Sequence, residues 1–167
     1  MPRDLATAQF LEKYTPEIAS QLQAARKHLA AHFPRGFELV YDNYNALVFV
    51  FSSSERASDA VLSVAGYPNW ITLFFANATR LSDPSNILEG SGSQFRSVRL
   101  QPLSRLQEPA VQEIIKAAKA AAATQFEAAP PLSTVVKSVS DMQRPRRPPS
   151  KKHTSNTKRA RSSASGA

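Results

Sequence analysis

A Gly-Ser-Gly segment followed by two arginines has the residue types that bind anions. Gly90 and Gly92 allow backbone N–H groups to converge on a negative charge. Arg96 and Arg99 can donate charge-assisted, bidentate hydrogen bonds to a phosphate or carboxylate. The segment lacks the Gly-Lys-Ser/Thr ending of a P-loop and does not lead from a strand into a helix. It therefore predicts a site for a small anionic ligand, with a tight turn beside two surface arginines as the alternative.

A polar insert separates two segments that are rich in aromatic and β-branched residues. It contains Asp42, Tyr44 and Asn45, whose carboxylate, phenol and amide groups can read the hydrogen-bonding edge of a ligand. This interpretation requires the insert to meet Arg96 or Arg99 in space. The alternative is a simple turn made by the acid and the amide, with Tyr44 packed at the edge of the core.

Other patterns that support catalysis or metal binding are weak in this sequence. His28 and His32 share a helix face and can chelate a divalent metal, but the third histidine, His153, is far along the chain. The sequence has no cysteine and no Gly-x-Ser-x-Gly segment, which excludes a thiolate site and a nucleophile elbow. We predict no catalytic residue, no metal site and no cofactor, and an enzyme of unassigned reaction is an alternative.

The net charge of +8 lies at the C-terminus. Residues 1–130 hold 12 Lys/Arg and 12 Asp/Glu, whereas residues 131–167 hold nine Lys/Arg and one acid. From residue 143 the chain has no large apolar residue, so we expect a disordered segment that binds nucleic acid through phosphates, without sequence preference. A solubilising extension is the alternative. The predicted contacts are Arg144, Arg146, Arg147, Lys151, Lys152, Lys158, Arg159 and Arg161.

The hydrophobic pattern predicts the elements that position these residues. Helices are expected within residues 5–33, with a start at Thr15-Pro16-Glu17, and from residue 109. Their apolar stripes are Ile18, Leu22, Ala25, Leu29 and Phe33 in the first region and Val111, Ile114, Ile115, Ala118 and Ala122 in the second. The β-rich residues between them predict about five strands, of which the first four form two hairpins. This order indicates an α+β fold, with N-terminal helices, a mostly antiparallel sheet and a C-terminal helix, in one domain over residues 5–142. Residues 134–139 can add a short strand, and Trp70 is expected in the core. The expected strands cover residues 37–41, 46–52, 60–65, 70–76 and 95–101.

An ordered series of motifs resembles the bacterial YdhG-like domain family. The series runs from Leu39-Val40-Tyr41-Asp42-Asn43-Tyr44-Asn45 through Pro68-Asn69-Trp70, Leu81-Ser82-Asp83-Pro84 and Leu88-Glu89-Gly90-Ser91-Gly92 to Arg96-Ser97-Val98-Arg99-Leu100. Most of the family is described as a domain of unknown function, and one branch as a frataxin-like iron chaperone. The resemblance implies a bacterial protein, and the absence of cysteine favours a cytoplasmic one. Iron binding favours clustered carboxylates, whereas the acids of this chain are scattered.

These observations predict a non-enzymatic module that binds a small anionic ligand or a protein. The expected ligand site contains Asp42, Tyr44, Asn45, Gly90, Gly92, Arg96 and Arg99. Nucleic acid is a second expected partner, through the basic C-terminal residues. No membrane partner is expected, because no run of about 20 apolar residues is present. The alternatives are an intracellular iron or metal chaperone and an enzyme, and the oligomeric state is left open.

Overall fold

The structure, a computed structural model, describes residues 3–148 and begins with two helices. Helix α1 (Arg3–Leu11) precedes helix α2 (Pro16–His32). The predicted start of α2 is confirmed, because the Thr15 hydroxyl oxygen accepts a hydrogen bond from the N–H of Ile18 at 3.3 Å and Pro16 takes the first helical position. The predicted apolar stripe of α2 is buried at Ile18, Leu22, Ala25 and Leu29.

Six strands form one mixed sheet in the order β5-β4-β3-β2-β1-β6. The first five strands pair antiparallel with their neighbours in the chain, whereas β6 pairs in parallel with β1. The optional strand at residues 134–139 is thus present as a sixth strand, and its parallel pairing with β1 is the feature that the prediction of a mostly antiparallel sheet missed. The strands are β1 (Phe37–Asp42), β2 (Leu47–Ser52), β3 (Ala60–Gly66), β4 (Ile71–Ala76), β5 (Phe95–Arg99) and β6 (Ser133–Val139).

Two helices connect β5 to β6 and return the chain to the opposite edge of the sheet. Helix α3 (Pro109–Ala121) starts at the predicted proline and buries Val111, Ile114, Ile115 and Ala118, and the short helix α4 (Ala123–Glu127) buries Phe126. A parallel partner for β1 requires a crossover of this length. Three short 3-10 helices complete the connections: η1 (Ala57–Asp59), η2 (Ala78–Arg80) and η3 (Leu103–Gln107).

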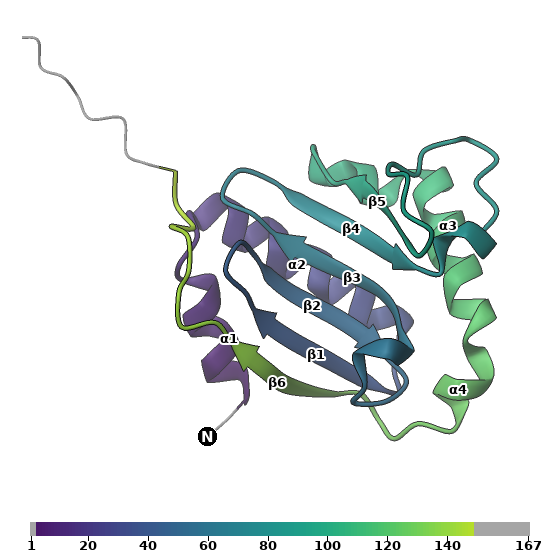
Figure 1. Cartoon of the computed structure of the whole chain (residues 1–167), viewed down its shortest axis with the longest axis horizontal. Coiled ribbons are helices and arrows are strands. Elements are labelled where there is room, and N and C mark those ends of the chain that lie inside the picture. The colour runs from purple at the N-terminus through teal and green to yellow at the C-terminus, as the bar shows by residue number, and fades with distance from the viewer. Residues whose placement is uncertain (1–2, 149–167) are drawn as a thin grey trace, which may run out of the picture.

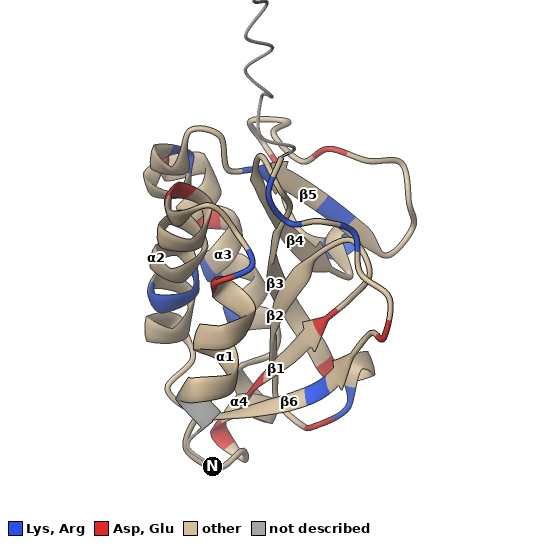
Figure 2. Cartoon of the chain, turned by 90° about the vertical axis from the view of Figure 1, so that its left-hand side faces the viewer, with Lys and Arg blue, Asp and Glu red and all other residues tan. Residues whose placement is uncertain are grey.

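The fold has two layers, with the helices gathered on one face of the sheet (Figures 1 and 2). The core lies between these layers, where α2 and α3 meet alternate residues of β2, β3 and β4, such as Phe49, Val64 and Leu73, all 0% exposed. In the part of the chain that the structure describes, no helix is long and apolar enough to span a membrane.

The chain after β6 forms an ordered strap, residues 140–148, that runs along α1 and the β1–β2 turn (Figure 1). The N–H of Ser140 donates to the carbonyl of Asp42 at 2.9 Å, and the N–H of Arg144 donates to the carbonyl of Tyr44 at 2.9 Å. Arg146 is only 3% exposed. The expected disorder from residue 143 is thus corrected for residues 143–148, and residues 149–167 lie outside the described part of the chain.

Candidate functional site

The predicted anion loop uses its own arginine internally. Arg96 Nε donates to the carbonyl of Gly92 at 3.0 Å, and Arg96 Nη1 donates to the carbonyl of Gly90. Gly90 has a φ of +115°, a conformation that favours glycine, and it turns its carbonyl toward the arginine. The loop therefore presents carbonyl acceptors to a cation of the same chain, which is the opposite of the predicted convergence of N–H donors on an anion.

Asp42 lies in a buried ion cluster that the sequence did not reveal. Its side chain is 0% exposed, with Oδ2 at 2.5 Å from Lys13 Nζ and Oδ1 at 3.0 Å from Arg146 Nη2. Arg146 Nη1 also donates to the Tyr14 hydroxyl at 2.7 Å. These contacts join the α1–α2 connection, β1 and the strap. Asp42 is therefore committed to its own chain, and its charged partners are Lys13 and Arg146 rather than Arg96 or Arg99.

Burial raises the pKa of Tyr14 above its ordinary value, and the positive charge of Arg146 opposes this effect. The hydroxyl of Tyr14 donates to the carbonyl of Gly66 at 2.6 Å and accepts from the N–H of Leu47 at 2.9 Å. With Arg146, three partners on three segments converge on this one oxygen. The cluster thus holds the β1–β2 turn, β3 and the strap together, which is a structural role.

The other predicted ligand residues are only partly brought together. Tyr44 is 48% exposed, and Asn45 lines a cleft together with Trp70. The guanidinium of Arg99 lies 4.4 Å from the centre of the Trp70 ring. Asn45 therefore shares a cleft with Trp70 and Arg99 contacts the Trp70 ring, while Arg96 bonds to the glycine loop. Trp70 itself is half-buried and is absent from the buried core, so the prediction of a core tryptophan is wrong.

The predicted nucleic-acid contacts also fall into separate groups. Arg146 is buried in the ion cluster and has no free surface. Arg144 and Arg147 are exposed on the strap, where Figure 2 shows basic positions between β6 and the grey C-terminal trace. The other five predicted contacts lie outside the described residues: Lys151, Lys152, Lys158, Arg159 and Arg161.

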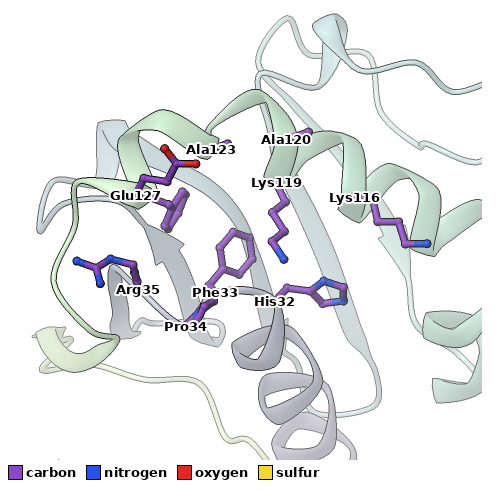
Figure 3. A pocket seen from close by; sticks show the side chains of 10 residues that line it. His32, Phe33, Pro34, Arg35, Lys116, Lys119, Ala120, Ala123 and Glu127 are labelled. Atoms are coloured by element: carbon purple, nitrogen blue, oxygen red, sulfur yellow. The ribbon is translucent and has the colours of Figure 1, made fainter.

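A pocket of about 590 Å³ lies where the C-terminal end of α2 meets α3 and α4, and we call it the α2–α4 pocket (Figure 3). Its apolar surface comes from Phe33 and Phe126, whose ring centres are 4.9 Å apart, and from Pro34 and two alanines of α3 and α4. The full lining is His32, Phe33, Pro34, Arg35, Lys116, Lys119, Ala120, Ala123, Phe126 and Glu127.

Positive charge surrounds this pocket. Figure 3 shows Lys119 reaching from α3 toward Phe33 and His32, with Arg35 and Lys116 at opposite ends. Among the described residues, Arg35, Lys116 and Lys119 form no ion pair. These three cations are therefore available to a negatively charged ligand.

Burial lowers the pKa of His32, and the positive charges of His28, Lys119 and Lys116 lower it further. The ring centres of His28 and His32 are 5.3 Å apart, and the two ring nitrogens of His28 lie 3.4 Å and 3.0 Å from the amide nitrogens of Gln107 and Gln112. Within the described residues, no three His, Cys, Asp or Glu side chains are placed to hold a metal ion.

The sequence carried only a partial signal for the α2–α4 pocket. Lys116 and Lys119 are three apart and share a helix face, and the apolar stripe on the opposite side of that helix was recognised. This face lies beside His32 and Arg35 because α3 packs against the end of α2. A local sequence pattern does not predict this packing.

Comparison with known proteins gave no match. No family model, no curated protein and no solved structure is similar to this chain at a significant level.

Proposed function

We propose that the protein is a non-enzymatic binding module of the YdhG-like type that holds a small anionic ligand in the α2–α4 pocket. The observation that carries this proposal is the set of three unpaired cations, Arg35, Lys116 and Lys119, around an apolar surface. The site differs from the one that the sequence predicted, but the class of ligand is the same.

The charge balance of the pocket favours an anion. The C-terminal ends of α2 and α3 lie here, and each carries about half a negative charge, so the basic residues also stabilise the two helix ends. Glu127 adds one further negative charge. Three full positive charges outweigh these contributions and leave an excess of about one, even with His32 neutral.

The shape and lining define the ligand further. A volume of about 590 Å³ lies in the range of small-molecule sites. The Phe33 and Phe126 rings, tilted by 43° to each other, suit an apolar body. Arg35 can pair with a carboxylate or phosphate through two parallel hydrogen bonds. The ligand class is therefore an apolar molecule with one acidic group.

The lining supports binding rather than catalysis. It includes no Ser, Thr, Tyr or Cys, so no hydroxyl or thiol nucleophile faces a bound ligand. Burial lowers the pKa of the His32 imidazole, and the charges of His28, Lys119 and Lys116 lower this pKa further, which favours the neutral form. An anionic ligand would weaken this effect and raise the pKa of His32.

Calorimetric titration of the full chain with 1-naphthoate and with its neutral analogue 1-naphthamide tests this proposal. We expect the acid to bind at least about tenfold more tightly, because a charge-assisted hydrogen bond contributes about 1.5–3 kcal/mol. Lys119→Ala should lower this preference, because one of the three lining cations is lost. Lys27→Ala is the matched control, since Lys27 is exposed on α2 and does not line the pocket. Equal affinity for the two probes, or equal effects of the two variants, would refute the site.

A second part of the proposal concerns nucleic acid. The basic residues at the C-terminus attract phosphates, and the binding they provide depends on salt and not on sequence. Because Arg146 is buried, this role falls to the exposed Arg144 and Arg147 and to the basic residues that follow them.

A further inference from the structure

A second cleft lies between the β3–β4 turn and the strap. Its volume is about 530 Å³, and its walls come from three places in the sequence: the β1–β2 turn, the β3–β4 turn and the strap. A smaller cavity of about 350 Å³ adjoins it and shares Pro68, Asn69, Trp70 and Pro148. The lining of the larger cleft is Asn45, Tyr67, Pro68, Asn69, Trp70, Arg144, Pro145, Arg147 and Pro148.

A rigid aromatic stack forms one wall. The Tyr67 and Trp70 ring centres lie 5.4 Å apart with an interplanar angle of 24°, and the Arg99 guanidinium lies 4.4 Å from the Trp70 ring centre. The N–H of Tyr67 donates to the carbonyl of Trp70 at 2.9 Å, which closes the turn that carries both rings. Half-buried aromatic rings held in this way can extend their stack with a planar ligand at little entropic cost.

Unpaired positive charge forms another part of the lining. Arg144 and Arg147 are exposed, neither forms an ion pair within the described residues, and the cleft lining contains no Asp or Glu. Arg147 donates one hydrogen bond to the carbonyl of Glu12 at 3.1 Å, which positions its side chain. The sequence has five more basic residues between positions 151 and 161.

We propose that this cleft binds single-stranded nucleic acid, with a base stacked on the Tyr67–Trp70 pair and phosphates on Arg144 and Arg147. The occupant must offer planar rings and repeated negative charge together, which an unpaired strand does. A duplex hides the faces of its bases, and an acidic peptide has no planar ring. The side-chain amides of Asn45 and Asn69 stand at the cleft to contact base edges.

This inference rests on the nucleic-acid part of the proposed function and gives it an ordered site. It is independent of the ligand in the α2–α4 pocket, because the two linings share no residue. The cleft holds the base, while the basic residues beyond the strap follow the phosphate backbone. Base stacking and phosphate contacts predict different signals. Stacking of a base changes the environment of the Tyr67 and Trp70 rings, whereas the phosphate contacts determine how steeply affinity falls with salt.

Trp70 is the single tryptophan of the chain, so its fluorescence reports directly on this cleft. The full chain is titrated with an oligothymidylate of about 12 nucleotides, a duplex of the same length and a polyglutamate peptide. We expect the single strand to quench the emission of Trp70 at saturation, and the duplex and the peptide to leave it nearly unchanged.

Paired variants separate the cleft from the C-terminal charges. Arg144→Ala with Arg147→Ala should lower the slope of log K against log salt by about 1.4 in magnitude, at about 0.7 per phosphate contact for a single strand. Lys158→Ala with Arg159→Ala removes the same charge and should weaken binding while leaving the full quench at saturation. Tyr67→Leu should reduce the affinity for the single strand and leave the affinity for the duplex unchanged.

Each contrary result is decisive. Binding of the single strand without a change in Trp70 emission would overturn the cleft and leave binding by the C-terminal charges intact. Equal quenching by the polyglutamate peptide would assign the cleft to an acidic peptide. No binding of the oligothymidylate at low salt would overturn both the cleft and the nucleic-acid part of the proposed function.

Discussion

Replacing Arg146 with methionine tests whether the strap is part of the folded domain. The change keeps most of the side-chain volume and removes the charge that faces Asp42 Oδ1 at 3.0 Å. Arg146 is 3% exposed and Asp42 is 0% exposed, so water cannot replace the lost partner without opening the strap.

The size of the effect follows from the contacts that remain. Removing one partner of a buried ion pair costs about 3–5 kcal/mol. Asp42 keeps Lys13 at 2.5 Å, and the Tyr14 hydroxyl keeps its bonds to Gly66 and Leu47. We therefore expect the lower end, about 3 kcal/mol, which corresponds to a fall in melting temperature of roughly 6–12 °C for a domain of this size.

Urea unfolding followed by circular dichroism measures this loss in the full chain. Arg144→Met is the matched control, since Arg144 is exposed on the same strap and only its backbone N–H is bonded, to Tyr44; we expect a change within about 0.5 kcal/mol. Combining Asp42→Asn with Arg146→Met should cost less than the sum of the single changes, because the two side chains interact directly. Equal, small effects of Arg146→Met and Arg144→Met would refute the ordered strap.

Three further changes test other parts of the fold. Tyr14→Phe should destabilise the protein by about 1–3 kcal/mol in urea unfolding, because Gly66, Leu47 and Arg146 lose a shared buried partner; no loss would mean that the hydroxyl network contributes nothing. Gly36→Ala should cost at least about 2 kcal/mol, since Gly36 has a φ of +107° and a Cβ there would lie 2.6 Å from the carbonyl oxygen of Ser52; a stable variant would contradict this backbone geometry. Because the pKa of His32 is lowered in the folded protein, the unfolded chain binds more protons as pH falls through about 6.5, and stability should drop there. His32→Gln should flatten this part of the curve of melting temperature against pH, and an unchanged curve would assign the drop to other groups.

Local sequence patterns were sufficient for most of the fold. The sequence predicted the Thr15-Pro16-Glu17 start of α2, the apolar stripes of α2 and α3, and the hairpins β1–β2 and β3–β4. Each depends on residues close together in the chain, where side-chain periodicity and capping act directly. The sixth strand was recognised only as an optional addition, because its parallel partner β1 lies about a hundred residues earlier.

The contacts of the candidate site residues are the part that local sequence patterns did not predict. Arg96 has the right chemistry for an anion, but it bonds to the carbonyls of its own loop. Asp42 has the right chemistry for a ligand, but the strap brings Arg146 to it. In each case the residue type indicated the chemistry of the side chain. Its hydrogen-bond or ion-pair partner is set by a turn geometry or by a distant segment, and composition and spacing specify neither.

By itself, the sequence determined the α+β class, the two helical regions, the antiparallel hairpins and the concentration of positive charge at the C-terminus. Tertiary structure alone decided which charges are neutralised and which are free. Packing buries Arg146 against Asp42 and Tyr14, and it leaves Lys119 and Arg147 beside open clefts. The physical reason is that burying a charge without a partner costs several kcal/mol. The fold therefore pairs the charges that it encloses, and the cations left at its surface are the ones available to ligands.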